Sequence, residues 1–261
     1  MIQKLLLGLY KLVSKTGFLK TSAGQWLFYK FYFLYKEYYE AKNSNSLKQF
    51  ITPHSSVIDV GANAGFFTKK FAGWISDDQK VFAFEPEPAN IRSLKSHLNS
   101  LLNKVVILEG VAGNRNCVVN LYLDPYHPAG HKISSQGIEV KSFKIDDVIS
   151  ANKDSISDIS LIKIDVQGAE KMVLEGALDT IDKYNPALFV EIDEEALKEF
   201  GTNSSEIFDM LSGLNYTPFY IDKKNKLREI NYIELEKILS EKKYTEILFQ
   251  TSKDRLKTTN D

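Results

Sequence analysis

Two glycines and a carboxylate in the first third of the sequence have the spacing of a site for a nucleoside-type ligand. In VIDVGANAGFFT (Val57–Thr68), Gly61 and Gly65 follow an apolar run typical of a buried strand. A strand that ends in a glycine turn and opens a helix brings backbone close to such a ligand. Glu85 directly follows the next apolar run, KVFAF, about 20 residues beyond Gly65, where a carboxylate accepts hydrogen bonds from ribose hydroxyls.

The turn differs from the fingerprint of dinucleotide-binding proteins. When G-x-G-x-x-G is read from Gly61, Asn63 and Phe66 stand where glycines are required. This disfavours pyrophosphate binding, and with it a nicotinamide-dependent oxidoreductase. It favours a ligand without phosphates, such as S-adenosylmethionine. The alternative is an ordinary strand–helix connection with two structural glycines.

Two carboxylates follow later apolar runs. Asp165 ends the run LIKI, and Glu191 lies near the end of the next run. Both fall at the edge of a parallel sheet where ligands bind. A hydroxyl that accepts a methyl group must lose its proton, and a carboxylate whose pKa is raised by its neighbour suits this task. The alternative is that Asp165 anchors the cofactor and Glu191 caps the sheet. Lys163, if buried, needs one of these acids as a partner.

His131 is the third candidate base. It lies near His127 in PYHPAGHKISSQ (Pro125–Gln136), a segment that we expect to reach over the acceptor site. Histidine titrates in the range that a base needs, and the alternative is a histidine in a surface loop. Two carboxylates and a histidine also form a ligand set for a divalent metal. Nothing in their spacing requires one, so the sequence predicts no metal.

These residues must be positioned by alternating strands and helices. Short apolar runs predict strands at 57–60, 80–84, 105–108, 161–164, 187–192, 215–221 and 244–250. Helical segments are predicted at 65–75, 88–102, 169–179 and 203–212. Residues 117–123 and 136–143 alternate as an antiparallel excursion does. Such an order of elements predicts a doubly wound, mostly parallel α/β sheet covered by helices on both faces.

Residues 1–45 differ in composition from residues 46–261. They are rich in aromatic residues and lysine, with almost no acid before Glu37, and their apolar residues recur at helical spacing. We expect an N-terminal helical extension, joined to the main domain by a polar linker at 42–46. Three interpretations of the extension stay open: a layer that shapes the acceptor pocket, a homodimer interface, or peripheral contact with a membrane surface.

Composition and charge narrow the class of protein. The 261 residues are 43% apolar and 26% charged, as in ordinary globular proteins. With 33 basic and 34 acidic residues, no net field attracts nucleic acid, and none is predicted as a partner. The single cysteine, Cys117, excludes an internal disulfide and a thiolate metal site. The sequence has no run of about 18 apolar residues. It predicts a cytoplasmic location, with the membrane surface as the open alternative.

Three motifs in this order resemble the FkbM-type methyltransferases. They are VIDVGANAGFFT, FEPEPAN (Phe84–Asn90) and IKIDVQGAEKMVLEGA (Ile162–Ala177), and the similarity continues through PALFVEI (Pro186–Ile192). The resemblance implies a Rossmann-like class I methyltransferase fold, with a seven-stranded sheet whose last strand runs antiparallel. It implies S-adenosylmethionine as the cofactor and methylation of a hydroxyl on a sugar, glycan or secondary metabolite. The alternatives are a methyltransferase with a nitrogen or carboxyl acceptor and a cofactor-binding protein without turnover.

The resemblance also implies roles for individual residues. Glu85, beside Pro86, is implied to hold the ribose, and Val111 and Ala112, after the third strand, are implied to flank the adenine. Gln167 stands where the family often has glutamate, which puts in doubt any role that needs a charge there. The implied lining of the methionine side of the cofactor is Asp59, Gly61, Asn63, Gly65, Phe66 and Thr68.

Overall fold

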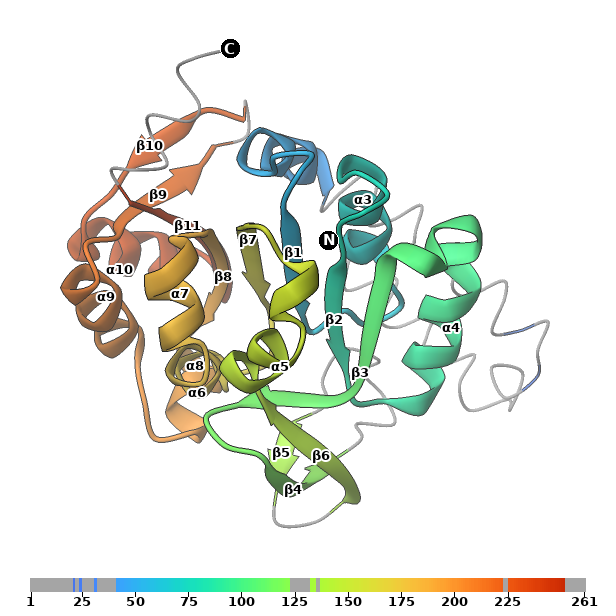
Figure 1. Cartoon of the computed structure of the whole chain (residues 1–261). Helices are drawn as coiled ribbons and strands as arrows, with labels where there is room; N and C mark the ends of the chain where they lie inside the picture. The colour runs from blue at the N-terminus through green and yellow to red at the C-terminus, as the bar shows by residue number, and fades with distance from the viewer. Residues whose placement is uncertain are drawn as a thin grey trace.

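The computed structural model describes residues 41–122, 132–134, 137–222 and 225–251, together with Thr21, Gly24 and Phe31. These residues include one 11-stranded sheet with the order β10-β9-β11-β8-β7-β1-β2-β3-β6-β4-β5 (Figure 1). The strands are β1 (Ser56–Val60), β2 (Val81–Glu85), β3 (Val105–Gly113), β4 (Cys117–Tyr122), β5 (Lys132–Ser134), β6 (Ile138–Lys144), β7 (Ile159–Ile164), β8 (Ala187–Asp193), β9 (Thr217–Ile221), β10 (Leu227–Glu229) and β11 (Tyr244–Gln250).

Helices connect most of the parallel strands. Three of the described helices are 3₁₀ helices: η3 (Ala41–Phe50), which precedes β1, η4 (Asn99–Lys104) and η5 (Lys153–Ser155). The α-helices are α3 (Phe66–Trp74), α4 (Pro88–Leu98), α5 (Ile145–Ala151), α6 (Glu170–Glu175), α7 (Leu178–Tyr184), α8 (Glu194–Glu199), α9 (Ser204–Gly213) and α10 (Tyr232–Glu241). No helix in the described part of the chain is both long enough and apolar enough to cross a membrane.

Seven neighbouring strands of this order, from β9 to β3, correspond to the seven-stranded sheet that the resemblance implies. β1 pairs in parallel with β2 and β7, β2 with β3, and β7 with β8. β11 runs antiparallel to both β8 and β9, as the resemblance implies for the last strand. The doubly wound α/β class is therefore confirmed. The sheet is wider than seven strands, because β10 extends one edge and β6, β4 and β5 extend the other, projecting at the lower end of Figure 1.

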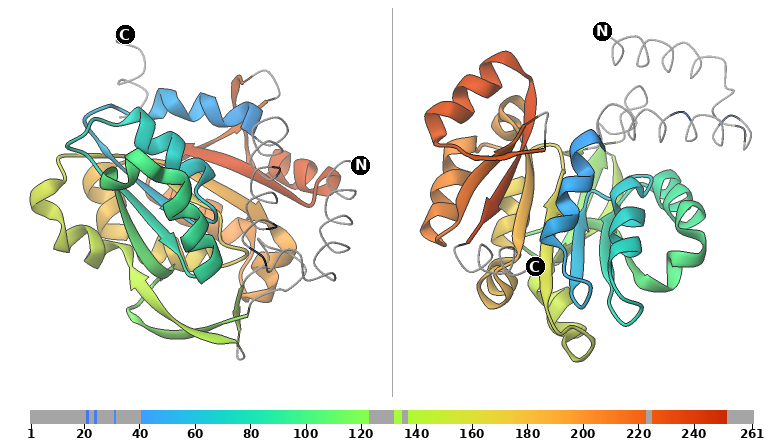
Figure 2. Two further views of the ribbon diagram at one scale, coloured as in Figure 1. Left: turned by 90° about the vertical axis from the view of Figure 1, so that its right-hand side faces the viewer. Right: turned by 90° about the horizontal axis from the view of Figure 1, so that it is seen from above.

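The two faces of the sheet carry different helices. Figure 1 shows α7, α9 and α10 on one side and α3 and α4 on the other, and the views in Figure 2 agree. On β1, Ile58 and Val60 belong to the core beneath α5 to α10, whereas Val57 packs with η3 and α3. Strand residues alternate between faces, so Asp59 points to the same side as Val57. On the face covered by η3 and α3, β1 therefore presents the apolar Val57 near its start and the charged Asp59 near its end.

Two predicted segments differ from the structure for reasons visible in the packing. The helix predicted at 169–179 is divided into α6 and α7 at Gly176. A Cβ at Gly176 would lie 2.0 Å from the carbonyl oxygen of Gly113, and the Gly176 carbonyl accepts a hydrogen bond from the amide of Asp146. The strand predicted at 105–108 continues to Gly113, because its second half pairs with β6.

The linker predicted at 42–46 was wrong, because these residues belong to η3. Leu47 and Phe50 of η3 are buried against Val57 of β1 and Phe71 of α3. The predicted boundary between residues 45 and 46 falls within this helix. The division into 1–45 and 46–261 stays a prediction, since most of residues 1–40 lie outside the described part of the chain.

We predict that η3 contributes to the stability of the sheet domain. Leu47→Ala should lower the free energy of unfolding by about 2–5 kcal/mol, because Leu47 is fully buried. Lys48→Ala, on the exposed side of the same helix, is the matched control and should change it by less than about 0.5 kcal/mol. Denaturant unfolding of the full chain measures both values. Equal stability of the two variants would show that η3 does not pack on the sheet as described.

Candidate active site

The turn after β1 has positive φ angles, which its two glycines allow. Gly61, Asn63 and Gly65 have φ angles of 77°, 50° and 91°, a region that glycine and asparagine tolerate best. A Cβ at Gly61 would lie 1.9 Å from the carbonyl oxygen of Asp165, and one at Gly65 would lie 2.5 Å from Cδ1 of Leu94. Gly61 therefore lets the end of β1 pass directly beside the end of β7.

Glu85 is bound to the glycine turn by its side chain. Its Oε2 accepts a hydrogen bond from the Asn63 amide at 2.7 Å, and its Oε1 accepts from the Glu87 amide and from Nδ2 of Asn90. The side chain is 4% exposed, and burial raises its pKa to about 7 despite these donors. An ionised carboxylate offers about four lone-pair sites. Three are used, so the carboxylate retains capacity for a ribose hydroxyl, and the donor set fits the expected cofactor.

The other residues implied for the cofactor lie around this turn. Phe66 is the first residue of α3, and Pro86 lies between β2 and α4. Val111 and Ala112 lie within β3 rather than after it, paired with Ser142 and Phe143 of β6. Val111 is two residues beyond Glu109, which is the register partner of Glu85. Ala112 is buried in the core beneath α5. Their roles toward the cofactor stay predictions.

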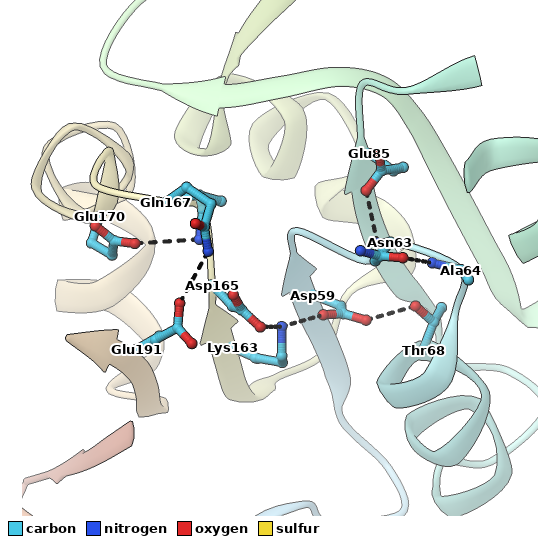
Figure 3. A network of polar contacts seen from close by, with 11 residues as sticks. Asp59, Asn63, Ala64, Thr68, Glu85, Lys163, Asp165, Gln167, Glu170 and Glu191 are labelled. Carbon is cyan, nitrogen blue, oxygen red and sulfur yellow. Dashed lines mark hydrogen bonds and ion pairs between the residues drawn. The ribbon is translucent and has the colours of Figure 1, made fainter. Parts of the chain in front are cut away.

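A chain of polar and charged side chains joins the first turn of α3 to the end of β7 (Figure 3). Asp59 is fully buried, and its Oδ2 accepts a hydrogen bond of 2.6 Å from Oγ1 of Thr68. Nζ of Lys163 lies 3.5 Å from Oδ1 of Asp59 and 3.3 Å from Oδ2 of Asp165. The expectation that Lys163 needs an acidic partner is met by Asp165, and Asp59 is a second partner that the sequence did not indicate.

Asp165 and Glu191 line one pocket at the ends of β7 and β8. Burial, followed by the negative charge of Asp165 and then that of Glu246, raises the pKa of Glu191 well above its usual range. Nε2 of Gln167 donates to Oε2 of Glu191 at 3.4 Å (Figure 3). The pocket is lined by Phe67, Lys163, Ile164, Asp165, Phe189, Glu191, Tyr244 and Glu246.

Not all the residues that line this pocket were identified from the sequence; Glu246 and Phe67 are two that were missed. Glu246 stands directly opposite Glu191 in the antiparallel pairing of β11 with β8, and this register joins segments more than 50 residues apart. Phe67 is the second residue of α3 and lines the pocket from that helix. Phe66 was selected because it occupies a motif position. Phe67, Phe71 and Trp74 recur at i, i+4 and i+7 and lie in ring contact on one side of α3, and this spacing in the sequence is the signal that could have indicated Phe67.

Glu170 holds the turn that follows Asp165. Its Oε1 accepts hydrogen bonds from the amides of Val166 and Gly168 at 3.3 and 3.2 Å. The side chain is 2% exposed, and burial raises its pKa to about 7. Gln167 has a φ of 51° within this turn. The glutamate thus fixes the backbone that directs Gln167 toward Glu191.

The remaining predictions about the site fall elsewhere. His131 lies outside the described residues, as does the rest of the segment Pro125–Gln136 except β5. Nearly all of the extension for which pocket-shaping, dimer and membrane-surface roles were considered also lies outside them. Within the described ranges, no three histidine, cysteine, aspartate or glutamate side chains are grouped as metal ligands.

Comparison with known families decides the class of protein. Residues 59–218 match the family described as Methyltransferase FkbM domain, which is more than half of the chain. The chain belongs to the FkbM methyltransferase family. The matched region begins at Asp59 and includes the glycine turn, Glu85, Asp165 and Glu191. The expected family and the expected class of enzyme, an S-adenosylmethionine-dependent methyltransferase, are confirmed.

Several solved structures are similar to this FkbM chain. Methyltransferase FkbM from Methylobacillus flagellatus KT aligns with 15% identity and a TM-score of 0.49, over 77% of this chain and 44% of that chain. This chain therefore spans less than half the length of that protein. An O-methyltransferase from Bacillus cereus in complex with SAH aligns with 10% identity and a TM-score of 0.46, over 81% and 80% of the two chains. No curated protein matched the sequence.

We predict that the Glu85 side chain of this FkbM domain binds the ribose of the cofactor. Glu85→Ala should weaken S-adenosylmethionine binding by about 1–3 kcal/mol, the loss of a charge-assisted hydrogen bond, or about 5- to 150-fold in Kd. Glu109→Ala is the matched control, because Glu109 is the register partner of Glu85 on β3 and is exposed. Isothermal titration measures both variants, and equal Kd values would refute the assignment.

Cofactor affinity should also depend on the protonation of Glu85. Its pKa of about 7 means that the carboxyl is largely protonated at pH 6 and ionised at pH 8. Ribose hydroxyls donate better to the ionised form, so Kd should fall as the pH rises toward 8, by up to about tenfold per pH unit below the pKa. Glu85→Gln should remove this dependence. A wild-type Kd that does not change between pH 6 and 8 would contradict the role of Glu85.

Proposed function

We propose that this methyltransferase transfers the methyl group to a hydroxyl of a sugar, glycan or secondary metabolite. The observation that carries the proposal is the pocket in which the Asp165 and Glu191 carboxylates lie beside the cofactor turn. A hydroxyl acceptor needs a group that takes its proton as the new bond forms. In a carboxylate pair in which burial and the neighbouring charge raise the pKa of one member, the other member is the one that can accept this proton.

The walls of the pocket support an acceptor with both apolar and hydroxyl-bearing surfaces. Phe67, Phe189 and Tyr244 provide aromatic surface, and Asp165 and Glu246 provide hydrogen-bond acceptors. Aromatic surface combined with polar groups at fixed positions is typical of small-molecule sites. Carboxylates accept hydrogen bonds from hydroxyls but have no donor to offer when they are ionised, which favours an acceptor rich in hydroxyls.

The placement of Asp165 relates the pocket to the cofactor. S-adenosylmethionine, when bound, supplies a methyl group on a positively charged sulfur. The residues of the glycine turn and Glu85 would hold it, and the carbonyl of Asp165 adjoins that turn at Gly61. An acceptor hydroxyl in the pocket would be within reach of the Asp165 carboxylate, which lines it. Alignment of the two reactants contributes much of the acceleration in such a transfer, and Asp165 orients the hydroxyl and receives its proton.

We predict that Asp165→Asn lowers kcat by about 10²- to 10⁴-fold while the Kd of S-adenosylmethionine stays within about twofold, because a base acts in the transition state. Asp158→Asn, just before the first residue of the same strand, is the matched control and should keep the wild-type kcat. Wild-type turnover by Asp165→Asn at saturating acceptor would exclude Asp165 as the base. Loss of cofactor binding would assign it to the cofactor site.

The acceptor class is tested by transfer of a labelled methyl group from S-adenosylmethionine to a panel of compounds. The panel contains free and nucleotide-activated sugars, lipid-linked glycans and hydroxylated secondary metabolites, with amines and carboxylic acids as comparison compounds. We expect label in a base-stable ether. Label in an amine or a base-labile ester would instead favour the alternative acceptors, and cofactor binding without any transfer would favour a protein that binds without turnover.

A further inference from the structure

Lys163 is the buried cation of the site. Its side chain is 3% exposed, and it stands on β7 opposite Asp59 of β1 and Phe189 of β8. Nζ lies between Oδ1 of Asp59 and Oδ2 of Asp165, and 5.0 Å from the centre of the Phe67 ring. A lysine ammonium has three donors and no acceptor. A single positive charge is therefore shared by two carboxylates on neighbouring strands.

The two carboxylates depend on Lys163 to different degrees. Asp59 is fully buried, and Thr68 is the hydrogen-bond donor to its Oδ2, while Oδ1 faces Lys163 without a hydrogen bond. Asp165 is 34% exposed and faces the pocket. The ion pair with Lys163 thus fixes the direction of a side chain that water and substrate can reach.

Glu191, the neighbour of Asp165, has different surroundings. No ion pair to Glu191 occurs among the residues that the structure describes, and its one amide donor is Gln167 at 3.4 Å. Three carboxylates act on it: Asp165 of the β7 end, Glu246 of β11 and Glu170 of α6. Two adjacent carboxyl groups of this kind share one proton over a range of pH, and the surroundings decide which group holds it.

We propose that Lys163 is a positioning residue that keeps the negative charge of the pair on Asp165 and the shared proton on Glu191, so that Asp165 is the carboxylate that receives the acceptor proton. This inference rests on the proposed function. Three observations carry it: the 3.3 Å contact between Lys163 and Asp165, the burial of Lys163, and the carboxylates around Glu191.

The proton and the charges balance in this arrangement. The acceptor oxygen forms a bond to the methyl carbon, the bond from that carbon to sulfur breaks, and its electron pair stays on sulfur. The hydroxyl proton moves to Asp165, and the negative charge of Asp165 and the positive charge of the sulfonium are both lost. Glu191 keeps its proton and donates a hydrogen bond to the ionised Asp165 before the transfer, which holds that carboxylate beside the pocket.

Titration of the two carboxyl groups by ¹³C NMR tests this assignment without an acceptor or a cofactor. The full chain carries ¹³C label in the aspartate and glutamate carboxyls, and Asp165→Asn and Glu191→Gln assign the two resonances. We expect Asp165 to titrate at a pH more than about one unit below Glu191. If Asp165 titrates at or above Glu191, the proposal is wrong, whatever the kinetic result for Asp165→Asn.

Paired substitutions test whether Lys163 is the cause. Lys163→Met alone leaves Asp59 as a buried, unpaired charge, so Lys163→Met is combined with Asp59→Asn, which removes both charges of the buried pair. In the double variant the pKa of Asp165 should rise by about 1–3 units, and the pKa of Glu191 should move toward it. Asp59→Asn alone keeps Lys163 and should keep Asp165 below Glu191. A folded double variant with the wild-type titration order and an unshifted Asp165 would overturn the proposal.

Discussion

A lysine buried between two aspartates determines how this site is built. Removing charges from water costs several kcal/mol per ion unless they are paired at close range, so Lys163, Asp59 and Asp165 must stay together. Their strands are held at this spacing because Gly61 lets β1 pass beside the carbonyl of Asp165. The glycine turn, which Glu85 holds through the Asn63 amide, and the pocket lined by Asp165 and Glu191 meet at that contact. A side chain at Gly61 would separate the two halves of the site.

Two further buried carboxylates of the site, Glu85 and Glu170, bind protons more tightly in the folded chain than in the unfolded chain. Burial raises the pKa values of Glu85 and Glu170 from 4.5 to about 7. Each group binds its proton more tightly in the folded chain, so its contribution to stability is present below pH 4.5 and is lost as the pH rises through about 7. At neutral pH the fold therefore holds partly ionised acids in buried positions, as is common at binding and catalytic sites.

Much of this arrangement could be predicted from the sequence, because it depends on local patterns. The apolar runs located the seven strands of the main sheet, and Gly61 and Gly65 located the turn whose Asn63 amide donates to Glu85. Contacts between distant segments could not be predicted. The antiparallel register places Glu246 opposite Glu191, Gly113 interrupts a predicted helix at Gly176, and the buried Leu47 converts a predicted linker into part of the core. None of these contacts produces a periodic pattern of apolar residues within a single segment of the sequence.

The central claim about this site is that the turn between β1 and α3, together with Glu85, binds S-adenosylmethionine, a ligand without phosphates. The most direct measurement is isothermal titration of the full chain with S-adenosylmethionine and, separately, with NAD. One saturable site for S-adenosylmethionine and no binding of NAD at the same concentrations is the expected result, because Asn63 and Phe66 stand where the pyrophosphate fingerprint needs glycines. Binding of NAD with equal or higher affinity, or no binding of S-adenosylmethionine to the folded chain, would contradict it.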